Sequence, residues 1–254
     1  MTKSINPDTL IAMSVLIVIL MYAVWSSVFS LGKIALQVSP PLFLTAARML
    51  LASALLFGFL ACFRRKDFRF QKKQFLGIGL VAFFGMYLTN ALEFWSLQHL
   101  TAAKTCFIYS LGPFFTVFFS YLHFKEKMSI RKWVGLFIGF GAIIPVLLIG
   151  KDPGELLSIV PFLSWPEIAM IGASARTVYG WVLMRVVLKN EEGGVSPIML
   201  NASSMLLGGL MALANSLFID SWNPLPVPGS SMGGFLQGVV MMTLISNVLC
   251  YNLY

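Results

Sequence analysis

The sequence predicts an all-α integral membrane protein, an inverted repeat of five-helix modules in which eight spans of a ten-span design are present. Three observations predict this fold. Apolar segments of about 20 residues, enough to cross a bilayer as helices, recur along the chain. Hydrophobic residues make up 58% of the chain and charged residues 11%, whereas roughly a quarter of a soluble domain is charged. The later part of the chain also repeats landmarks of the earlier part.

Eight segments satisfy the length for a membrane span. Because the bilayer core offers no water to backbone amides, each of these segments must be helical. The first is longer than the apolar core of a cleavable signal peptide and lacks a small-residue cleavage pattern, so we predict a retained span. In chain order the segments are 10–31, 42–62, 75–97, 101–122, 131–149, 166–188, 197–219 and 233–254.

The basic residues favour one side of this arrangement. Most of the 18 Lys and Arg residues precede the first span, fill the second and fourth loops, or follow the sixth span. Alternating spans place all of these positions on the same side, so the positive-inside rule predicts a cytoplasmic amino terminus. We expect the protein to lie in the inner membrane. The basic loops suit contact with the lipid bilayer. No finger spacing or aromatic–basic interleaving indicates nucleic-acid binding, despite the net charge of +8.

Matching landmarks indicate an internal repeat. Ser39 opens the second span and Ser196 opens the seventh. Asn90 and Asn247 follow these two serines at the same distance. Spans one to three therefore correspond to spans six to eight, and the repeated unit is five helices long.

The repeat divides the chain into a first module at 1–150 and a second module at 151–254. An odd number of spans inserts the second copy upside down relative to the first. Inverted repeats are typical of secondary transporters, which bind substrate near the midplane between the two halves. The second module lacks its last two helices, so we expect the sequence to be a truncated form of a ten-span protein.

Motifs in a fixed order run through nearly the whole chain, at 25–33, 48–52, 90–97, 110–116, 125–139 and 174–188. Their order and spacing resemble the EamA module of the drug/metabolite transporter superfamily. The resemblance implies a ten-helix carrier of small polar metabolites that works by alternating access. One branch of the family exchanges S-adenosylmethionine for S-adenosylhomocysteine, and the basic second loop is similar to that branch. Export of amino acids or drugs is the alternative within the family.

Charges inside spans are the first candidates for a substrate site, because burying an unpaired charge in a membrane is costly. Arg176 lies near the middle of the sixth span, and its planar guanidinium suits a carboxylate or phosphate. Arg48 and Lys104 lie nearer the outer surface. We expect these three cations to attract the anionic part of a metabolite, and Glu93 to attract the cationic part.

Other roles for these charges stay open. Glu93 can instead pair with Arg48 or Lys104, or load a proton. Arg176 can donate to backbone carbonyls that Pro113 leaves without a partner. The side chain of Arg48 can extend to the membrane surface and place its charge in water.

Aromatic residues at middle depth are the second group of candidates. Trp25, Tyr109 and Tyr179 can stack on an adenine ring or contact a cation, with ordinary packing as the alternative. Gly112 and Pro113 fall within the fourth span. Proline removes an amide donor and kinks a helix, so this pair is a candidate hinge for alternating access.

The sequence contains no motif for nucleotide hydrolysis, no nucleophile elbow and no metal-ligand spacing. We therefore expect no cofactor, no metal and no catalytic residues, and transport driven by a gradient or by exchange. Two hypotheses from other classes remain, a membrane-embedded transferase and a non-transporting scaffold. The oligomeric state stays open.

Overall fold

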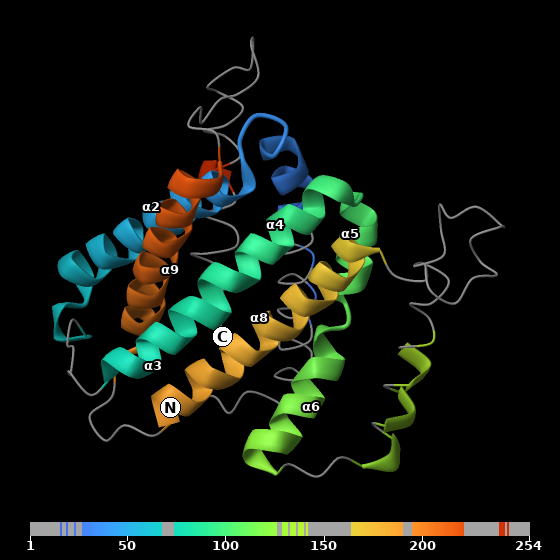
Figure 1. Cartoon of the computed structure of the whole chain (residues 1–254). Coiled ribbons are helices and arrows are strands. Elements are labelled where there is room, and N and C mark those ends of the chain that lie inside the picture. Colours follow the sequence, from blue (N-terminus) through green and yellow to red (C-terminus); the bar gives the residue numbers. More distant parts are fainter. Residues whose placement is uncertain are drawn as a thin grey trace.

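The computed structural model is helical throughout the residues that it describes, and its helices form three groups (Figure 1). Helices α2 (Pro41–Phe63) and α9 (Pro197–Ile219) form the first group. The second group is α8 (Trp165–Lys189) beside a continuous run of α3 (Phe75–Leu80), the π-helix η3 (Val81–Leu88) and α4 (Thr89–His99). The third is α5 (Ala102–Tyr109) with α6 (Gly112–Phe124). A short 3-10 helix, η1 (Arg65–Asp67), follows α2.

The described residues are 27–67, 74–125, 129–131, 133–135, 137–139, 164–189, 195–220 and 239–241, with single residues at 16, 19, 23, 141 and 243.

Within the described part of the chain, four helical segments are long and apolar enough to cross a membrane, which confirms the expected all-α membrane class. They match the predicted second, third, fourth and seventh spans. Helix α8 matches the sixth span and has 25 residues, but its charges lower its hydropathy. The predicted first, fifth and eighth spans lie mostly outside the described residues. The four segments are Pro41–Phe63, Phe75–His99, Ala102–Phe124 and Pro197–Ile219.

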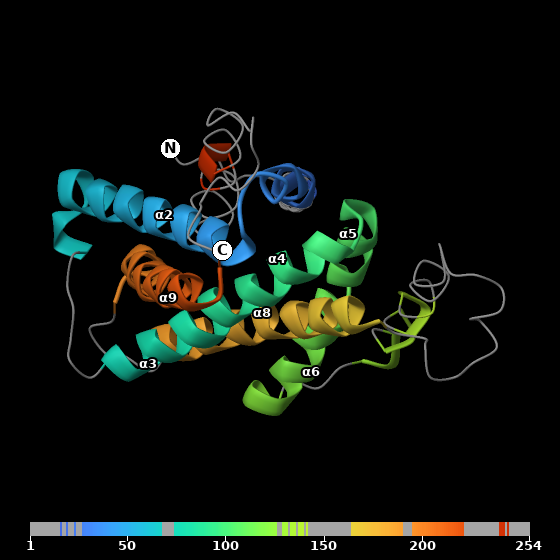
Figure 2. The ribbon, with the colours of Figure 1, turned by 45° about the horizontal axis from the view of Figure 1, so that its top comes forward.

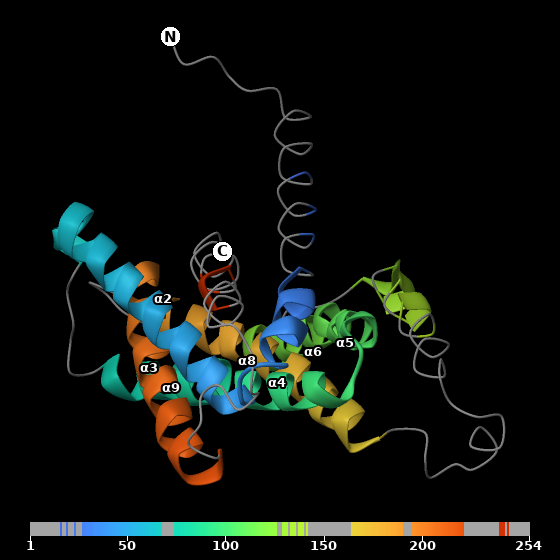
Figure 3. The ribbon, with the colours of Figure 1, turned by 90° about the horizontal axis from the view of Figure 1, so that it is seen from above.

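Helices α2 and α9 pack against each other in opposite directions (Figures 1 and 3). The amide of Phe43, at the start of α2, donates to Asp220 at the end of α9, at 3.2 Å. Farther along, the Ser53 hydroxyl donates to the Ala202 carbonyl at 3.0 Å. Both helices have 23 residues and carry proline in the first turn, where the missing amide donor costs nothing.

Helix α8 also runs opposite to the neighbouring run of α3, η3 and α4 (Figure 2). Gly77 near the start of that run lies against Val187 near the end of α8, and Gly85 lies against Gly180. The two backbones meet so closely at Gly85 that a Cβ atom on Gly180 would lie 2.6 Å from the Gly85 Cα. Small residues at such contacts let membrane helices approach each other. Helix α8 thus lies between this run and α6, and protein packs against it on both sides.

The fourth span is two helices, where the sequence predicted one helix kinked at Pro113. Helix α5 ends at Tyr109, and Pro113 lies in the first turn of α6. A proline cannot donate to the carbonyl four residues earlier, which belongs to Tyr109. That carbonyl instead accepts from the Ser174 hydroxyl of α8, at 3.3 Å. Ser174, and not Arg176, is therefore the residue that donates to the carbonyl left free by Pro113.

Candidate functional site

Arg48 is held inside the bundle rather than extending to the surface. It is only 2% exposed, and its guanidinium donates to the side-chain oxygen of Asn90. The same guanidinium lies over the ring of Phe94, 4.5 Å from the ring centroid. Asn90 is fixed in turn, because its amide nitrogen donates to the Met86 carbonyl at 2.6 Å. Thr243, in the predicted eighth span, donates to the Arg48 carbonyl at 3.3 Å. Arg48 therefore joins three predicted spans.

Glu93 lies on the same helix as Asn90 and Phe94, within one turn of both. It is 5% exposed, and in the described part of the chain its carboxylate makes no hydrogen bond or ion pair. Arg48 and the Cys106 thiol both lie within electrostatic range of its carboxylate. Arg48 and Glu93 are thus opposite charges buried near each other without a direct ion pair.

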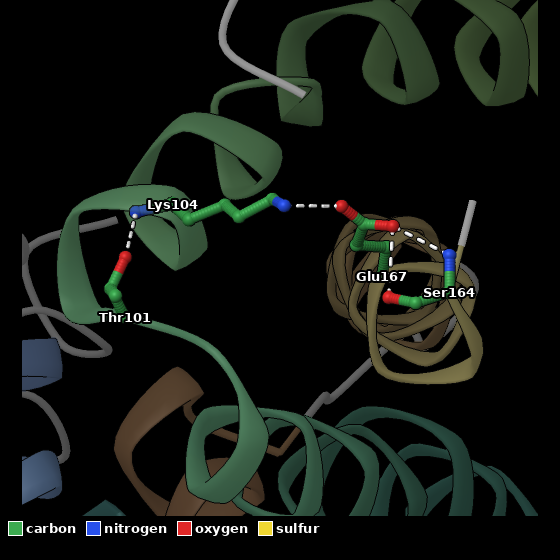
Figure 4. A network of polar contacts seen from close by, with 4 residues as sticks. All are labelled: Thr101, Lys104, Ser164 and Glu167. Atoms are coloured by element: carbon green, nitrogen blue, oxygen red, sulfur yellow. Dashed lines mark hydrogen bonds and ion pairs between the residues drawn. The ribbon is translucent and has the colours of Figure 1, made fainter. Parts of the chain in front are cut away.

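Lys104 pairs with Glu167, so the alternative in which it pairs with Glu93 is wrong. The Lys104 ammonium lies 2.6 Å from a carboxylate oxygen of Glu167, whose side chain is 0% exposed. Figure 4 shows this contact joining α5 to the start of α8. The other carboxylate oxygen of Glu167 accepts from the Ser164 amide at 2.6 Å and from the Ser164 hydroxyl at 2.9 Å. Thr101 caps α5 by accepting from the Lys104 amide at 3.2 Å.

Glu167 is the charged residue that the sequence analysis missed. It is the third residue after Ser164, and a serine followed at this spacing by glutamate is a capping-box pattern. That pattern could have located the start of α8. It would not have identified Lys104 as the partner, because their contact depends on how α5 packs against α8.

Arg176 lies midway along α8 and is half-buried. Among the described residues it makes no hydrogen bond, ion pair or ring contact. Its helix neighbour Thr177 is buried and bonded. The structure thus leaves the guanidinium of Arg176 available, and does not bring it into the contacts of Arg48.

The two candidate tyrosines lie in different surroundings. The Tyr109 hydroxyl is 2.7 Å from the Thr177 hydroxyl, and it is the donor because Thr177 donates to the Ala173 carbonyl. Its ring meets Phe29 edge-on, at 5.2 Å between centroids. Tyr179 instead lies among three rings, those of Phe84, Phe119 and His123. Trp25 lies outside the described residues.

The structure therefore gathers part of the predicted site. Arg48, Glu93 and Tyr109 lie at one aromatic cluster that includes Phe94 and Cys106. Lys104 and Tyr179 are placed elsewhere by their partners. Among the described residues no group of His, Cys, Asp and Glu could hold a metal ion.

The known proteins that are similar to this chain are transporters. A model of the EamA-like transporter family matches residues 12–148, more than half of the chain. The S-adenosylmethionine/S-adenosylhomocysteine transporter of Chlamydia muridarum (strain MoPn / Nigg) is 38% identical over 95% of this chain and 74% of that protein. The transporter of the same name from Chlamydia trachomatis serovar L2 is 36% identical over 95% of this chain and 72% of its own length.

A solved crystal structure shares the fold. It has a TM-score of 0.64 and 17% sequence identity, and the match covers 91% of this chain and 74% of the other. The family match and the chlamydial relatives confirm the prediction of a transporter rather than an enzyme. The chain belongs to the EamA-like transporter family.

Proposed function

We propose that this protein is a secondary transporter that exchanges S-adenosylmethionine for S-adenosylhomocysteine across the inner membrane. The observation that carries the proposal is the buried pair of opposite charges at Arg48 and Glu93. Both metabolites carry an anionic carboxylate together with at least one cationic group, so a site with one fixed cation and one fixed anion suits compounds of this class. The names of the chlamydial relatives support this substrate class.

Most candidate residues have a part in this proposal. Arg176 binds the substrate carboxylate, because its guanidinium is available and can form two parallel hydrogen bonds with it. Arg48, held by Asn90 and Phe94, attracts the same carboxylate as a fixed positive charge. Tyr109 and Trp25 supply aromatic faces for the adenine, whereas Tyr179 is held among three other rings and lies outside that group. Lys104 is paired with Glu167, so it is not among the proposed binding contacts.

The proposed architecture is a ten-span inverted repeat with a cytoplasmic amino terminus. The antiparallel packing of α2 against α9 supports it, because these are the second helices of the two modules and an inverted repeat requires them to run in opposite directions. Gly112 and Pro113, at the break between α5 and α6, are the proposed hinge.

Counterflow in reconstituted vesicles tests the transport proposal. Vesicles loaded with unlabelled S-adenosylhomocysteine should accumulate labelled S-adenosylmethionine transiently, and empty vesicles should not. Vesicles loaded with an amino acid or a nucleotide sugar are the matched controls. Counterflow with these controls instead of the adenosyl compounds would assign another substrate, and no counterflow with any of them would reject a carrier.

Replacing Arg176 with alanine is expected to abolish uptake while the amount of protein in the membrane stays normal. The substitution removes the hydrogen bonds between the guanidinium and the substrate carboxylate, and such bonds to a charged group contribute about 1.5–3 kcal/mol. Uptake of labelled substrate, divided by the membrane content of the protein, measures the effect. Arg176→Lys keeps the charge without the planar fork and should retain part of the uptake. Normal uptake by Arg176→Ala would remove this residue from the site.

A further inference from the structure

Glu93 is a carboxylate enclosed by apolar and aromatic side chains. Phe94 and Leu97, which follow it on α4, both belong to the buried cluster at this part of the bundle. Cys106 lies within electrostatic range of Glu93 and packs against the same cluster. The carboxylate finds no hydrogen-bond donor among the described residues. A buried anion without such donors is costly, and a bound cation would offset that cost.

Arg48 does not fill the place of that cation. Its guanidinium is directed to the Asn90 side chain and to the Phe94 ring. No ion pair joins it to Glu93 within the described part of the chain. Arg48 therefore lowers the electrostatic cost of Glu93 from a distance and leaves the carboxylate oxygens available for a second positive charge.

The two proposed substrates differ in one positive charge. Both carry the carboxylate, the ammonium, the ribose and the adenine. S-adenosylmethionine has an additional methyl group on sulfur, which makes the sulfur a positively charged sulfonium. A residue that binds only the shared groups cannot distinguish the two compounds, whereas a carboxylate placed at the sulfur can.

The surroundings of Glu93 suit a sulfonium better than an ammonium. An ammonium that enters an apolar site loses hydrogen bonds to water and needs acceptors to replace them. A sulfonium has no N–H or O–H group, so it enters such a site without this loss, and aromatic faces attract cations of this type. Phe29, Tyr109 and Trp181 all belong to the cluster beside Glu93.

Building on the proposed function, we infer that the Glu93 carboxylate binds the sulfonium and is the residue that distinguishes S-adenosylmethionine from S-adenosylhomocysteine. The shared amino-acid and adenosine parts are bound by other residues. The site then holds S-adenosylmethionine, whose sulfur is cationic, more strongly than S-adenosylhomocysteine, whose sulfur is a neutral thioether.

Titration calorimetry on the purified full-length protein tests this assignment, with both compounds measured against wild type and Glu93→Gln. The substitution should weaken S-adenosylmethionine binding at least about 30-fold, as expected when one partner of a buried charge pair is lost. Binding of S-adenosylhomocysteine should stay unchanged, which also shows that the variant is folded. Glu93→Asp retains the charge and should retain a preference for the sulfonium compound.

Three other results would overturn the assignment. An equal loss for both compounds would place Glu93 at the shared ammonium. Unchanged affinity for both would place it outside the site, and no preference in Glu93→Asp would mean that charge is not the determinant. Wild-type protein that binds neither compound would instead reject the proposed substrates, which is a distinguishable failure.

Discussion

Replacing Lys104 with alanine is expected to lower the free energy of unfolding by about 3–5 kcal/mol, because it leaves a buried charge without its partner. The Glu167 side chain is 0% exposed and lies 2.6 Å from the Lys104 ammonium. Ser164 still donates two hydrogen bonds to the other carboxylate oxygen, but these do not supply a positive charge. Thermal unfolding in detergent, followed by circular dichroism, measures the loss.

Two variants separate lost charge compensation from lost packing. Lys104→Met with Glu167→Gln removes both charges while keeping similar side-chain volumes, so it should recover most of the stability. Exchanging the two residues, as Lys104→Glu with Glu167→Lys, should recover less, because the Ser164 donors then face an ammonium. A Lys104→Ala variant as stable as wild type would show that the ion pair contributes nothing to the packing of α5 against α8.

Hydropathy and proline positions predicted most of the spans that the structure describes, although the fourth span is divided into α5 and α6. The second and seventh spans were placed almost to the residue, because proline in the first turn marks where a helix begins. The sixth span was also predicted, although Arg176 and Glu167 reduce its hydropathy. Most of its other residues are apolar, and the 25 residues of α8 are enough to cross a bilayer.

Partners of the charged residues could not be predicted in the same way. The sequence showed that Arg48 and Lys104 lie within spans, but their environments come from other helices. Arg48 is buried because Asn90 and Phe94 lie on the neighbouring helix. Its side chain contacts these two residues instead of extending to the membrane surface. Lys104 meets Glu167 only because α5 packs against the start of α8. The Tyr109 carbonyl, which Pro113 cannot satisfy, likewise finds its donor on α8.

The close approach of α8 to η3 gives the other large expected effect, which alanine at Gly180 should reveal. A Cβ atom there would lie 2.6 Å from the Cα and 3.4 Å from the amide nitrogen of Gly85. These are backbone atoms, so no side chain can turn aside, and the two helices must separate. Overpacking of this kind costs about 1–3 kcal/mol and sometimes more. Since α8 also carries Arg176, the separation should lower uptake together with the melting temperature in detergent.

Two further glycines make this a graded test. Gly172 is on the same helix, and an added Cβ there meets no atom within 4 Å. Gly172→Ala should therefore be as stable as wild type or more stable, by up to about 1 kcal/mol from helix propensity. A Cβ on Gly85 would lie 3.1 Å from the Gly180 Cα, so Gly85→Ala should fall between the two. If Gly180→Ala and Gly172→Ala melt at the same temperature, the two backbones are not in contact in the membrane protein. The order Gly172, Gly85, Gly180 in increasing loss can arise only from that contact, because helix propensity alone favours alanine at all three positions.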